Sequence, residues 1–230
     1  LSFAGGLTLG SSGEVDLSRS TLSVGQVLDL SSGTFGSDNS SLYLQSATTL
    51  SANDQVTGQE TVTFEDIYFN GNVLTLGSAS THLKVNEPLA LAGIALETGP
   101  GSLTLSGALS LRNQERINSS GGTITLESGG SVASGSTLSL PDTTLVMQSP
   151  LSIASSTLKA SNTTFTTNAN ALTLSGSILE VEGAQDLSGV SLDNSSTLRL
   201  AGDSTINDSA ALSVGTLALE NFSLTLDDAM

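Results

Sequence analysis

The chain has 230 residues, no cysteine, and 22 acidic residues against 6 Lys and Arg residues, giving a formal charge of -16. This charge disfavours binding to nucleic acid or to an anionic membrane surface, and the lack of cysteine excludes disulfides and thiolate metal sites. Ser and Thr make up about three residues in ten and aromatic residues only 3%, so we expect a core of stacked aliphatic side chains inside a hydroxyl-rich surface.

Apolar-x-apolar triplets return about every 21 residues along the whole chain, in three separate phases. The first series begins at Leu7, Leu28, Leu50, Ile67, Leu89, Leu109, Val132, Leu151, Leu172, Val190 and Leu212. The second begins at Val15, Phe35, Val56, Leu74, Ile94, Ile117, Leu138, Leu158, Leu179, Leu198 and Leu217. The third begins at Leu22, Leu42, Val62, Leu83, Leu103, Ile124, Leu145, Phe165, Leu187, Ile206 and Leu224.

Three strands per repeat predict an all-β fold, a right-handed three-sided parallel β-helix of about eleven coils. Each triplet turns two aliphatic side chains inward and one residue outward, and Gly, Ser and Asn clusters between the triplets form the corners. Antiparallel hairpins in a sandwich are the alternative interpretation, but they give no reason for equivalent phases to recur along the whole chain. We expect one domain over residues 1–230. Because the sequence begins in mid-pattern, we expect it to be a mature product or a piece of a longer protein.

The middle residues of the triplets sort the surface into three faces. On the second face Lys159, Glu180 and Arg199 occupy equivalent positions in consecutive coils, which predicts a ladder of opposite charges that fixes the register. The first face carries mostly small side chains, and this flat strip suits packing against another rod or plain solvation. Its residues are Thr8, Asp29, Ser51, Tyr68, Ala90, Ser110, Ala133, Ser152, Thr173, Ser191 and Ser213.

Threonine recurs on the third face, where it forms the T-x-T pairs Thr61/Thr63, Thr123/Thr125 and Thr164/Thr166. These pairs resemble the T-x-T arrays of β-helical ice-binding proteins, in which a flat Thr ladder orders surface water. Tyr43, Lys84 and Val146 interrupt the array, and Thr is common in any strand. The predicted binding surface consists of Thr63, Thr104, Thr125 and Thr166.

Two carboxylates are the candidates for catalysis. Glu180 and Glu182 lie two residues apart and therefore share a face, which is the arrangement that a β-helix uses to cleave polysaccharides. Glu180 also belongs to the charge ladder, and no aromatic platform for a sugar lies near it in the sequence. His82 is the only histidine and has no G-x-S-x-G companion, so we interpret it as an ordinary corner residue.

Acidic and Asn residues collect in the corner that follows the second strand. Hard oxygen ligands on successive rungs are the kind that Ca²⁺ prefers, and the candidate ligands are Asp38, Asn39, Asp186 and Asp203. Their spacing matches neither an EF-hand loop nor the glycine-rich nonapeptide repeat. The sequence predicts no other cofactor.

Stretches such as GGLTLGSSGEVDLSRSTLSVG, GGTITLESGGSVASGSTLSL and NALTLSGSILEVEG resemble the β-helical passenger segments of autotransporter and filamentous-haemagglutinin-like adhesins of bacteria. The resemblance spans most of the chain and rests on G-x-L-T-L triplets with Ser and Gly corners. It implies an exported, rod-like stalk or an adhesive segment.

These observations predict a non-enzymatic, extracellular or cell-surface β-solenoid rod of a bacterial or phage surface assembly. Its expected partners are other copies or flanking domains of that assembly and cell-surface glycans. A tailspike-like β-helix that binds or cleaves polysaccharide, as a lyase or a glycosidase, is one alternative hypothesis, and an ice-binding solenoid is the other. No apolar run reaches the eighteen or so residues that would span a bilayer, so we expect no membrane insertion.

Overall fold

The apolar-x-apolar triplets form short β-strands in the computed structural model of the chain, and the strands of successive coils pair in parallel. The structure describes the backbone of residues 2–3, 7–8, 14–18, 21–24, 28–29, 34–49, 54–56, 59–69, 73–76, 79–91, 95–168, 171–207 and 213–227. Within these ranges, side chains are described from residue 61 to residue 226.

The strands of the first series form sheet I. Two further strands of this series, β2 (Leu7–Thr8) and β5 (Leu28–Asp29), pair with each other. Sheet I has six strands in spatial and chain order, namely β11 (Leu89–Ala90), β14 (Leu109–Leu111), β17 (Gly130–Ala133), β20 (Leu151–Ala154), β23 (Leu172–Ser175) and β25 (Val190–Leu192).

The strands of the second series form sheet II. The main path of sheet II runs through β7 (Asp54–Val56), β9 (Leu74–Leu76), β12 (Ala95–Gly99), β15 (Arg116–Ser119), β18 (Thr137–Ser139), β21 (Thr157–Ser161), β24 (Ile178–Asp186), β26 (Thr197–Asn207) and β27 (Thr216–Ala218). A further strand, β28 (Leu224–Asp227), also pairs with β26.

The strands of the third series form sheet III. The main path of sheet III runs through β1 (Ser2–Phe3), β4 (Thr21–Val24), β6 (Thr34–Thr49), β8 (Gln59–Tyr68), β10 (His82–Val85), β13 (Ser102–Leu105), β16 (Thr123–Leu126), β19 (Thr144–Met147) and β22 (Thr164–Thr166). A further strand, β3 (Glu14–Ser18), also pairs with β6.

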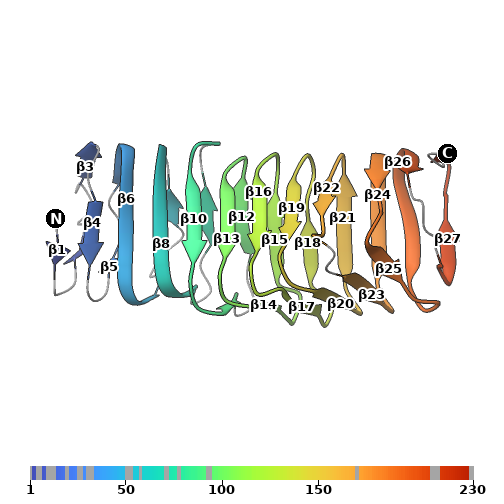
Figure 1. The fold of residues 1–230 in the computed structure, drawn as a ribbon, viewed down its shortest axis with the longest axis horizontal. Coiled ribbons are helices and arrows are strands. Elements are labelled where there is room, and N and C mark those ends of the chain that lie inside the picture. Colours follow the sequence, from blue (N-terminus) through green and yellow to red (C-terminus); the bar gives the residue numbers. More distant parts are fainter. Residues whose placement is uncertain are drawn as a thin grey trace.

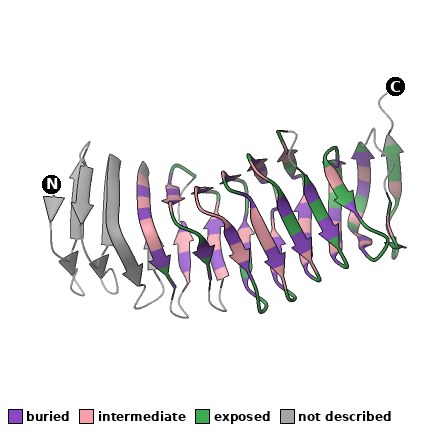
Figure 2. Ribbon diagram, turned by 60° about the horizontal axis from the view of Figure 1, so that its bottom comes forward, coloured by how far each residue is buried: buried purple, intermediate pink, exposed green. Residues whose placement is uncertain are grey.

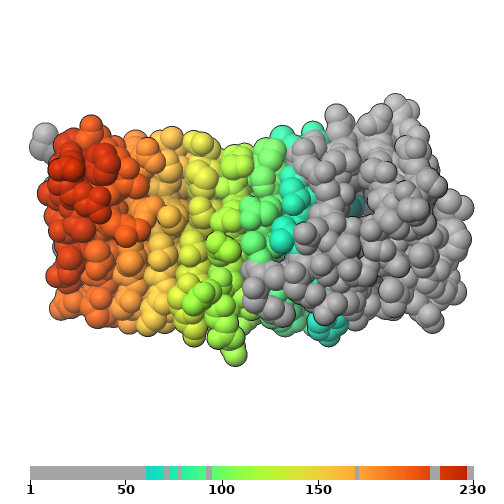
Figure 3. Space-filling model, turned by 180° about the vertical axis from the view of Figure 1, so that it is seen from behind, coloured from blue at the N-terminus to red at the C-terminus, as the bar shows by residue number. Residues whose placement is uncertain are grey.

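Stacking of these coils produces a rod, with β1 at one end and β27 at the other (Figure 1). On the face that Figure 3 shows, the coloured residues follow one another along the rod in sequence order. The part with described side chains spans about seven coils of about 21 residues each, and all described elements are strands. The predicted three-sheet parallel β-solenoid is confirmed, and its right-handed winding stays a prediction.

Inward-facing aliphatic side chains form one continuous core along the rod. Buried positions alternate with more exposed ones along the strands (Figure 2). On sheet III, for example, Leu103, Ile124 and Leu145 stack on consecutive strands and are at most 1% exposed. Each leucine buried in this way contributes about 1.5–3 kcal/mol of hydrophobic stabilisation. The core and the ladder hydrogen bonds therefore hold a chain that has no disulfides.

Left-handed residues turn the chain at the corners. At the corner between sheets II and III, Gly121, Asp142, Asn162 and Gly183 have φ values of 102°, 51°, 49° and 75°. Gly, Asn and Asp adopt this conformation at the lowest steric cost. The Asn162 side-chain amide also donates a hydrogen bond of 3.2 Å to the Asp142 carboxylate in the preceding coil. Part of the Asp and Asn enrichment at this corner therefore has a structural cause.

The register of sheet I differs from the predicted one at one coil. Val132 pairs with Leu111, although the repeat predicted a pair with Leu109. As a result Ser131, and not Ala133, is the outward partner in this column. A shift of two residues keeps every side chain on its side of the strand. The pattern therefore predicted the inward and outward faces correctly but the rung incorrectly.

The predicted register of the third series is also wrong near the C-terminal end of the chain. Ile206 pairs with Gln185, where the repeat predicted Leu187, and Leu224 pairs with Ser204, where it predicted Ile206. Gln185 and Ser204 are 1% and 4% exposed. Two polar side chains thus occupy inward positions that the sequence pattern assigned to leucine and isoleucine.

Candidate functional site

One column of outward residues runs along sheet II, and each residue in it pairs with its equivalent in the next coil. Near its N-terminal end the Asn118 side-chain amide donates a hydrogen bond of 2.7 Å to Glu97 Oε1. The column consists of Thr75, Glu97, Asn118, Ser139, Lys159, Glu180, Arg199 and Ala218.

Glu180 lies between two cations in this column. Lys159 Nζ is 3.1 Å from Glu180 Oε1, and Arg199 Nη2 forms a hydrogen bond and an ion pair with Oε2. Burial raises the pKa of Glu180, but the hydrogen bonds and positive charges of Arg199 and Lys159 outweigh it and lower the pKa below its usual value. The predicted charge ladder is confirmed, and the Glu180 carboxylate is ionised with both oxygens occupied.

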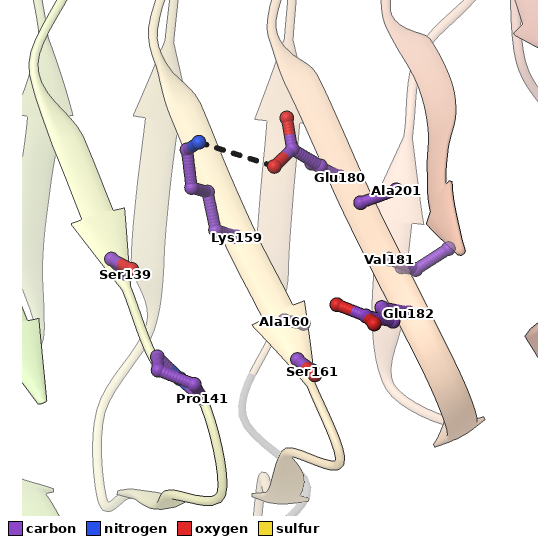
Figure 4. A pocket seen from close by; sticks show the side chains of 9 residues that line it. All are labelled: Ser139, Pro141, Lys159, Ala160, Ser161, Glu180, Val181, Glu182 and Ala201. Carbon is purple, nitrogen blue, oxygen red and sulfur yellow. Dashed lines mark ion pairs between the residues drawn. The ribbon is translucent and has the colours of Figure 1, made fainter. Parts of the chain in front are cut away.

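Glu182 follows two residues later on the same strand and is exposed. Its side chain lies against Gly202, where an added Cβ would come within 2.8 Å of Glu182 Cγ. Figure 4 shows the Glu180 carboxylate turned toward Lys159 while Glu182 lies further along β24. Both glutamates line a hollow of about 150 Å³, which is below the 300–1,000 Å³ typical of ligand sites.

This arrangement does not match two-carboxylate glycoside cleavage. A general acid needs a raised pKa, whereas the pKa of Glu180 is lowered. None of the described residues that line the hollow is aromatic: they are Ser139, Pro141, Lys159, Ala160, Ser161, Glu180, Val181, Glu182 and Ala201. The geometry therefore favours a structural role for Glu180.

The candidate calcium ligands lie at separate positions. Asp186 Oδ1 accepts a hydrogen bond of 2.9 Å from the Ser188 amide within its own turn. Asp203 Oδ1 accepts hydrogen bonds of 2.8 Å from the amide and the hydroxyl of Ser223, which lower the pKa of Asp203. Side chains at Asp38 and Asn39 lie outside the described residues. Among the described residues no three His, Asp or Glu side chains are placed to hold a metal ion, and calcium binding stays a prediction.

Asp193 is a carboxylate to which the sequence analysis above assigned no role. It accepts hydrogen bonds from the hydroxyls of Ser175, Ser195 and Ser196 at 2.6, 2.7 and 2.8 Å, and from the Gly176 amide at 3.3 Å. The three serine hydroxyls hold the pKa of Asp193 well below its usual range. Asp193 thereby ties the corner between sheets I and II to the preceding coil. The feature of the sequence that could have indicated this role is the D-x-S-S pattern of residues 193–196.

The predicted Thr surface lies on sheet III, and the structure adds further hydroxyls to it. In β13, β16, β19 and β22, two outward ranks run side by side over four consecutive coils. The pairs are Ser102/Thr104, Thr123/Thr125, Thr144/Val146 and Thr164/Thr166.

Thr63 is separated from this array by the rung of His82 and Lys84. Burial and the nearby charge of Lys84 lower the pKa of His82, so the imidazole is neutral at neutral pH. The structure thus brings Thr104, Thr125 and Thr166 into one surface and leaves Thr63 apart.

Small side chains alone make up the outward column of sheet I. This column consists of Ala90, Ser110, Ser131, Ser152, Thr173 and Ser191.

No helix among the described residues is long and apolar enough to cross a membrane.

Comparisons of the chain with protein-family models, with curated proteins and with solved structures found no match. The resemblance to bacterial adhesins therefore remains one of repeat style, and the fold and the surfaces described above carry the functional argument.

Proposed function

We propose that the protein is a non-enzymatic extracellular rod, which acts as a structural or adhesive segment of a bacterial or phage surface assembly. The observation that carries this proposal is the continuity of sheet II, whose strands pair in parallel without interruption from β7 to β27. Such stacking makes length proportional to the number of coils. It suits a protein whose task is to span a distance.

The surface chemistry supports the same proposal. Glu180 and Asp193, the carboxylates with the richest sets of partners described here, bond neighbouring coils to one another. The formal charge of -16 keeps such a rod soluble and away from other polyanions.

Exposed apolar side chains near the C-terminal end support partners from the same assembly. Leu217, Leu219, Phe222 and Leu226 are 47%, 38%, 37% and 69% exposed. Where exposed apolar side chains are contiguous, they mark interaction sites in soluble proteins. A flanking domain or another copy of the rod would cover them.

Surface labelling of the source organism tests this proposal. An antibody against the chain should label intact cells or particles, while an antibody against a cytoplasmic protein should label only permeabilised cells. Labelling by the first antibody only after permeabilisation would contradict an extracellular rod. So would polysaccharide cleavage by the purified protein that is lost in the Glu180→Gln, Glu182→Gln variant.

Ice binding is a second candidate function, which the two hydroxyl ranks of sheet III favour. An array of Thr and Ser residues over four coils, interrupted by Val146, is the feature on which water ordering would depend. We expect thermal hysteresis that Thr125→Lys abolishes and that the matched variant Ser152→Lys, on the outer face of sheet I, retains. Absence of hysteresis in the wild type at millimolar concentration excludes this candidate.

A further inference from the structure

The last coil of the rod leaves inward-facing apolar side chains uncovered. Leu217 pairs with Leu198 in the coil before it, and Leu226 pairs with Ile206. Paired positions of a parallel sheet turn their side chains to the same face, so both leucines face inward as their partners do. Leu198 and Ile206 are at most 1% exposed, whereas Leu217 and Leu226 are 47% and 69% exposed. The difference arises because none of the described coils stacks beyond the last one.

The strands of this coil also have a free edge. Both β27 and β28 pair with β26, and none of the described strands pairs with their other edge. Figure 1 shows β27 at the end of the rod. Such an edge presents unpaired N–H and C=O groups, to which another strand can add. The open edge and the uncovered leucines therefore suit the same partner, a β-strand that brings apolar side chains of its own.

A second copy of the chain placed head to tail does not supply this strand in register. It would set its β1 against β28 of the first copy. Both strands hold the third-series position, since β1 pairs with β4 of that series and β28 begins at Leu224. Between two such strands the chain passes through sheets I and II. A head-to-tail copy therefore cannot continue all three sheets of the rod.

A second copy placed tail to tail meets the requirement. A two-fold interface needs only one surface that is complementary to itself, and an apolar surface meets this condition because it needs no opposite charge. Two β27 strands related by a two-fold axis across the rod run antiparallel, so each supplies hydrogen-bonding groups to the free edge of the other. Leu217 is the middle residue of β27 (Thr216–Ala218) and lies opposite its equivalent in this arrangement.

Charge opposes such a contact. Each copy has a formal charge of -16, and Glu220 lies exposed between β27 and β28. Salt screens repulsion between exposed charges and does not weaken the burial of apolar side chains. Association through the leucines should therefore strengthen with salt, whereas association through ion pairs would weaken.

We propose that two copies of this chain associate tail to tail, with the β27 strands pairing antiparallel about a two-fold axis and the inward-facing leucines of the two last coils covering one another. This dimer deepens the proposed function by naming one partner of the rod, and it rests on that function only for its biological setting. Surface labelling tests where the rod is found, whereas the mass of the chain in solution tests the dimer, so either proposal can fail alone.

Sedimentation of the full chain tests the dimer. Over about 1–300 μM chain, a range that covers micromolar dissociation constants, we expect the mass to rise from 23.2 kDa to twice that value and no further. The dimer fraction should increase between about 50 mM and about 500 mM NaCl. A chain that stays monomeric at the highest concentration and salt overturns the proposal. So do species that continue to grow beyond the dimer, or a dimer that salt dissociates.

Two charge variants connect the dimer to the open end of the rod. Leu217→Asp and Leu226→Asp should each weaken it about tenfold or more, because the contact would bury a carboxylate without a partner. Ser152→Asp adds the same charge at an exposed position on the outer face of sheet I and should dimerise as the wild type does. Unchanged dimerisation in both leucine variants, or an equal loss in Ser152→Asp, overturns the proposal.

A single cysteine tests the contact without adding charge to the last coil. L217C should oxidise to a covalent dimer, because the two-fold axis brings the two β27 strands within the distance of a disulfide. S152C, on the side of the rod, should stay monomeric under the same conditions. Native circular dichroism spectra of both variants are the control for folding. A folded L217C that forms no covalent dimer, or an S152C that closes as readily, contradicts the tail-to-tail contact.

Discussion

The coils from residue 102 to residue 161 consist of short strands of similar length, whereas those from residue 162 to residue 207 include two much longer strands. In the first region the strands have three to five residues and pair without register shifts on all three sheets. In the second, β24 and β26 have 9 and 11 residues, continue through a corner, and pair with a shift between Val181 and Gly183. Sheet III ends there at β22.

The difference shows that the coils can stack without every coil having the same strand lengths. Regular coils place an aliphatic side chain at nearly every inward position, and their outer surface is small and polar. Both regions also bury polar side chains, among them Ser119 and Thr143 in the regular coils and Gln185 and Ser204 in the irregular ones, and a surface hollow lies beside Phe165 in the irregular coils. Sheet II, with Lys159, Glu180 and Arg199 in its outward column, carries the rod across this interruption.

Truncating a core leucine in the regular region should have the largest effect. Leu138 is 1% exposed, and Leu138→Ala should lower the free energy of unfolding by about 2–5 kcal/mol, because a cavity remains in the stack. The matched variant Leu217→Ala, at a side chain that is 47% exposed, should cost less than about 1 kcal/mol. Urea unfolding followed by circular dichroism checks both. Equal losses would contradict a continuous core in the middle coils.

Adding one methyl group at a close approach between coils should introduce an irregularity into the regular region. A Cβ on Gly122 would lie 1.9 Å from the Gly101 carbonyl oxygen, so Gly122→Ala should destabilise the fold by about 1–3 kcal/mol. Hydrogen exchange of residues 95–126 should rise, while Ser120→Ala, at an exposed neighbour, should leave it unchanged. Unaltered exchange in Gly122→Ala would show that the coils are not stacked this closely.

The corner hydroxyls should matter even in the irregular region. Ser196 is fully buried, and its hydroxyl lies within hydrogen-bond distance of two acceptors, the Leu174 carbonyl at 3.1 Å and Asp193 Oδ1 at 2.8 Å. We expect Ser196→Ala to lower the free energy of unfolding by about 0.5–1.5 kcal/mol. An equally stable variant would mean that the corner between sheets I and II does not depend on this hydroxyl.

The charge ladder across the interruption should give the smallest effect, and it should depend on pH. Because Lys159 and Arg199 are 45% and 37% exposed, water screens them, and Glu180→Gln should cost about 0.2–1 kcal/mol at pH 7. The pKa of Glu180 is lowered on folding. Its stabilisation is therefore complete above the unfolded pKa of about 4.3 and is lost as the pH falls through the folded pKa.

Thermal melts of the wild type and of Glu180→Gln, from pH 7 down to about pH 2, check this prediction, since the charge that distinguishes the two proteins is lost as the pH falls through the folded pKa. The two curves should differ at pH 7 and converge in acid. High salt should also reduce the difference at pH 7. A difference that persists unchanged in acid and in salt would assign the effect to packing.

The sequence pattern was sufficient for the fold because inward and outward positions alternate with a period of two. It did not determine which rung each triplet joins. Ser131 and Ala133 both face outward, and only backbone pairing selects Ser131 as the partner of Ser152. The same ambiguity concealed Gln185, because Leu187 nearby satisfied the apolar pattern two residues later.

The candidate sites were predictable to different degrees. The ladder at Glu180 followed directly from the repeat, since like positions in consecutive coils must stack. The partners of Asp193 and the cavity beside Phe165 did not, because both depend on how a corner folds onto the coil before it. The backbone conformation of a corner depends on its own Gly, Asn and Asp residues. The repeat of apolar triplets therefore does not predict it.

Disulfide trapping between coils tests the stacked register most directly, because the natural chain has no cysteine. In S131C/S152C the two cysteines replace residues that pair across β17 and β20, with Cα atoms about 4.8 Å apart, within the range for a disulfide. We expect this pair to oxidise readily and to keep the native circular dichroism spectrum, and A133C/S152C, displaced by two residues, to oxidise much more slowly. Preferential closure of A133C/S152C, or failure of both pairs in a folded protein, would contradict the parallel solenoid in this register.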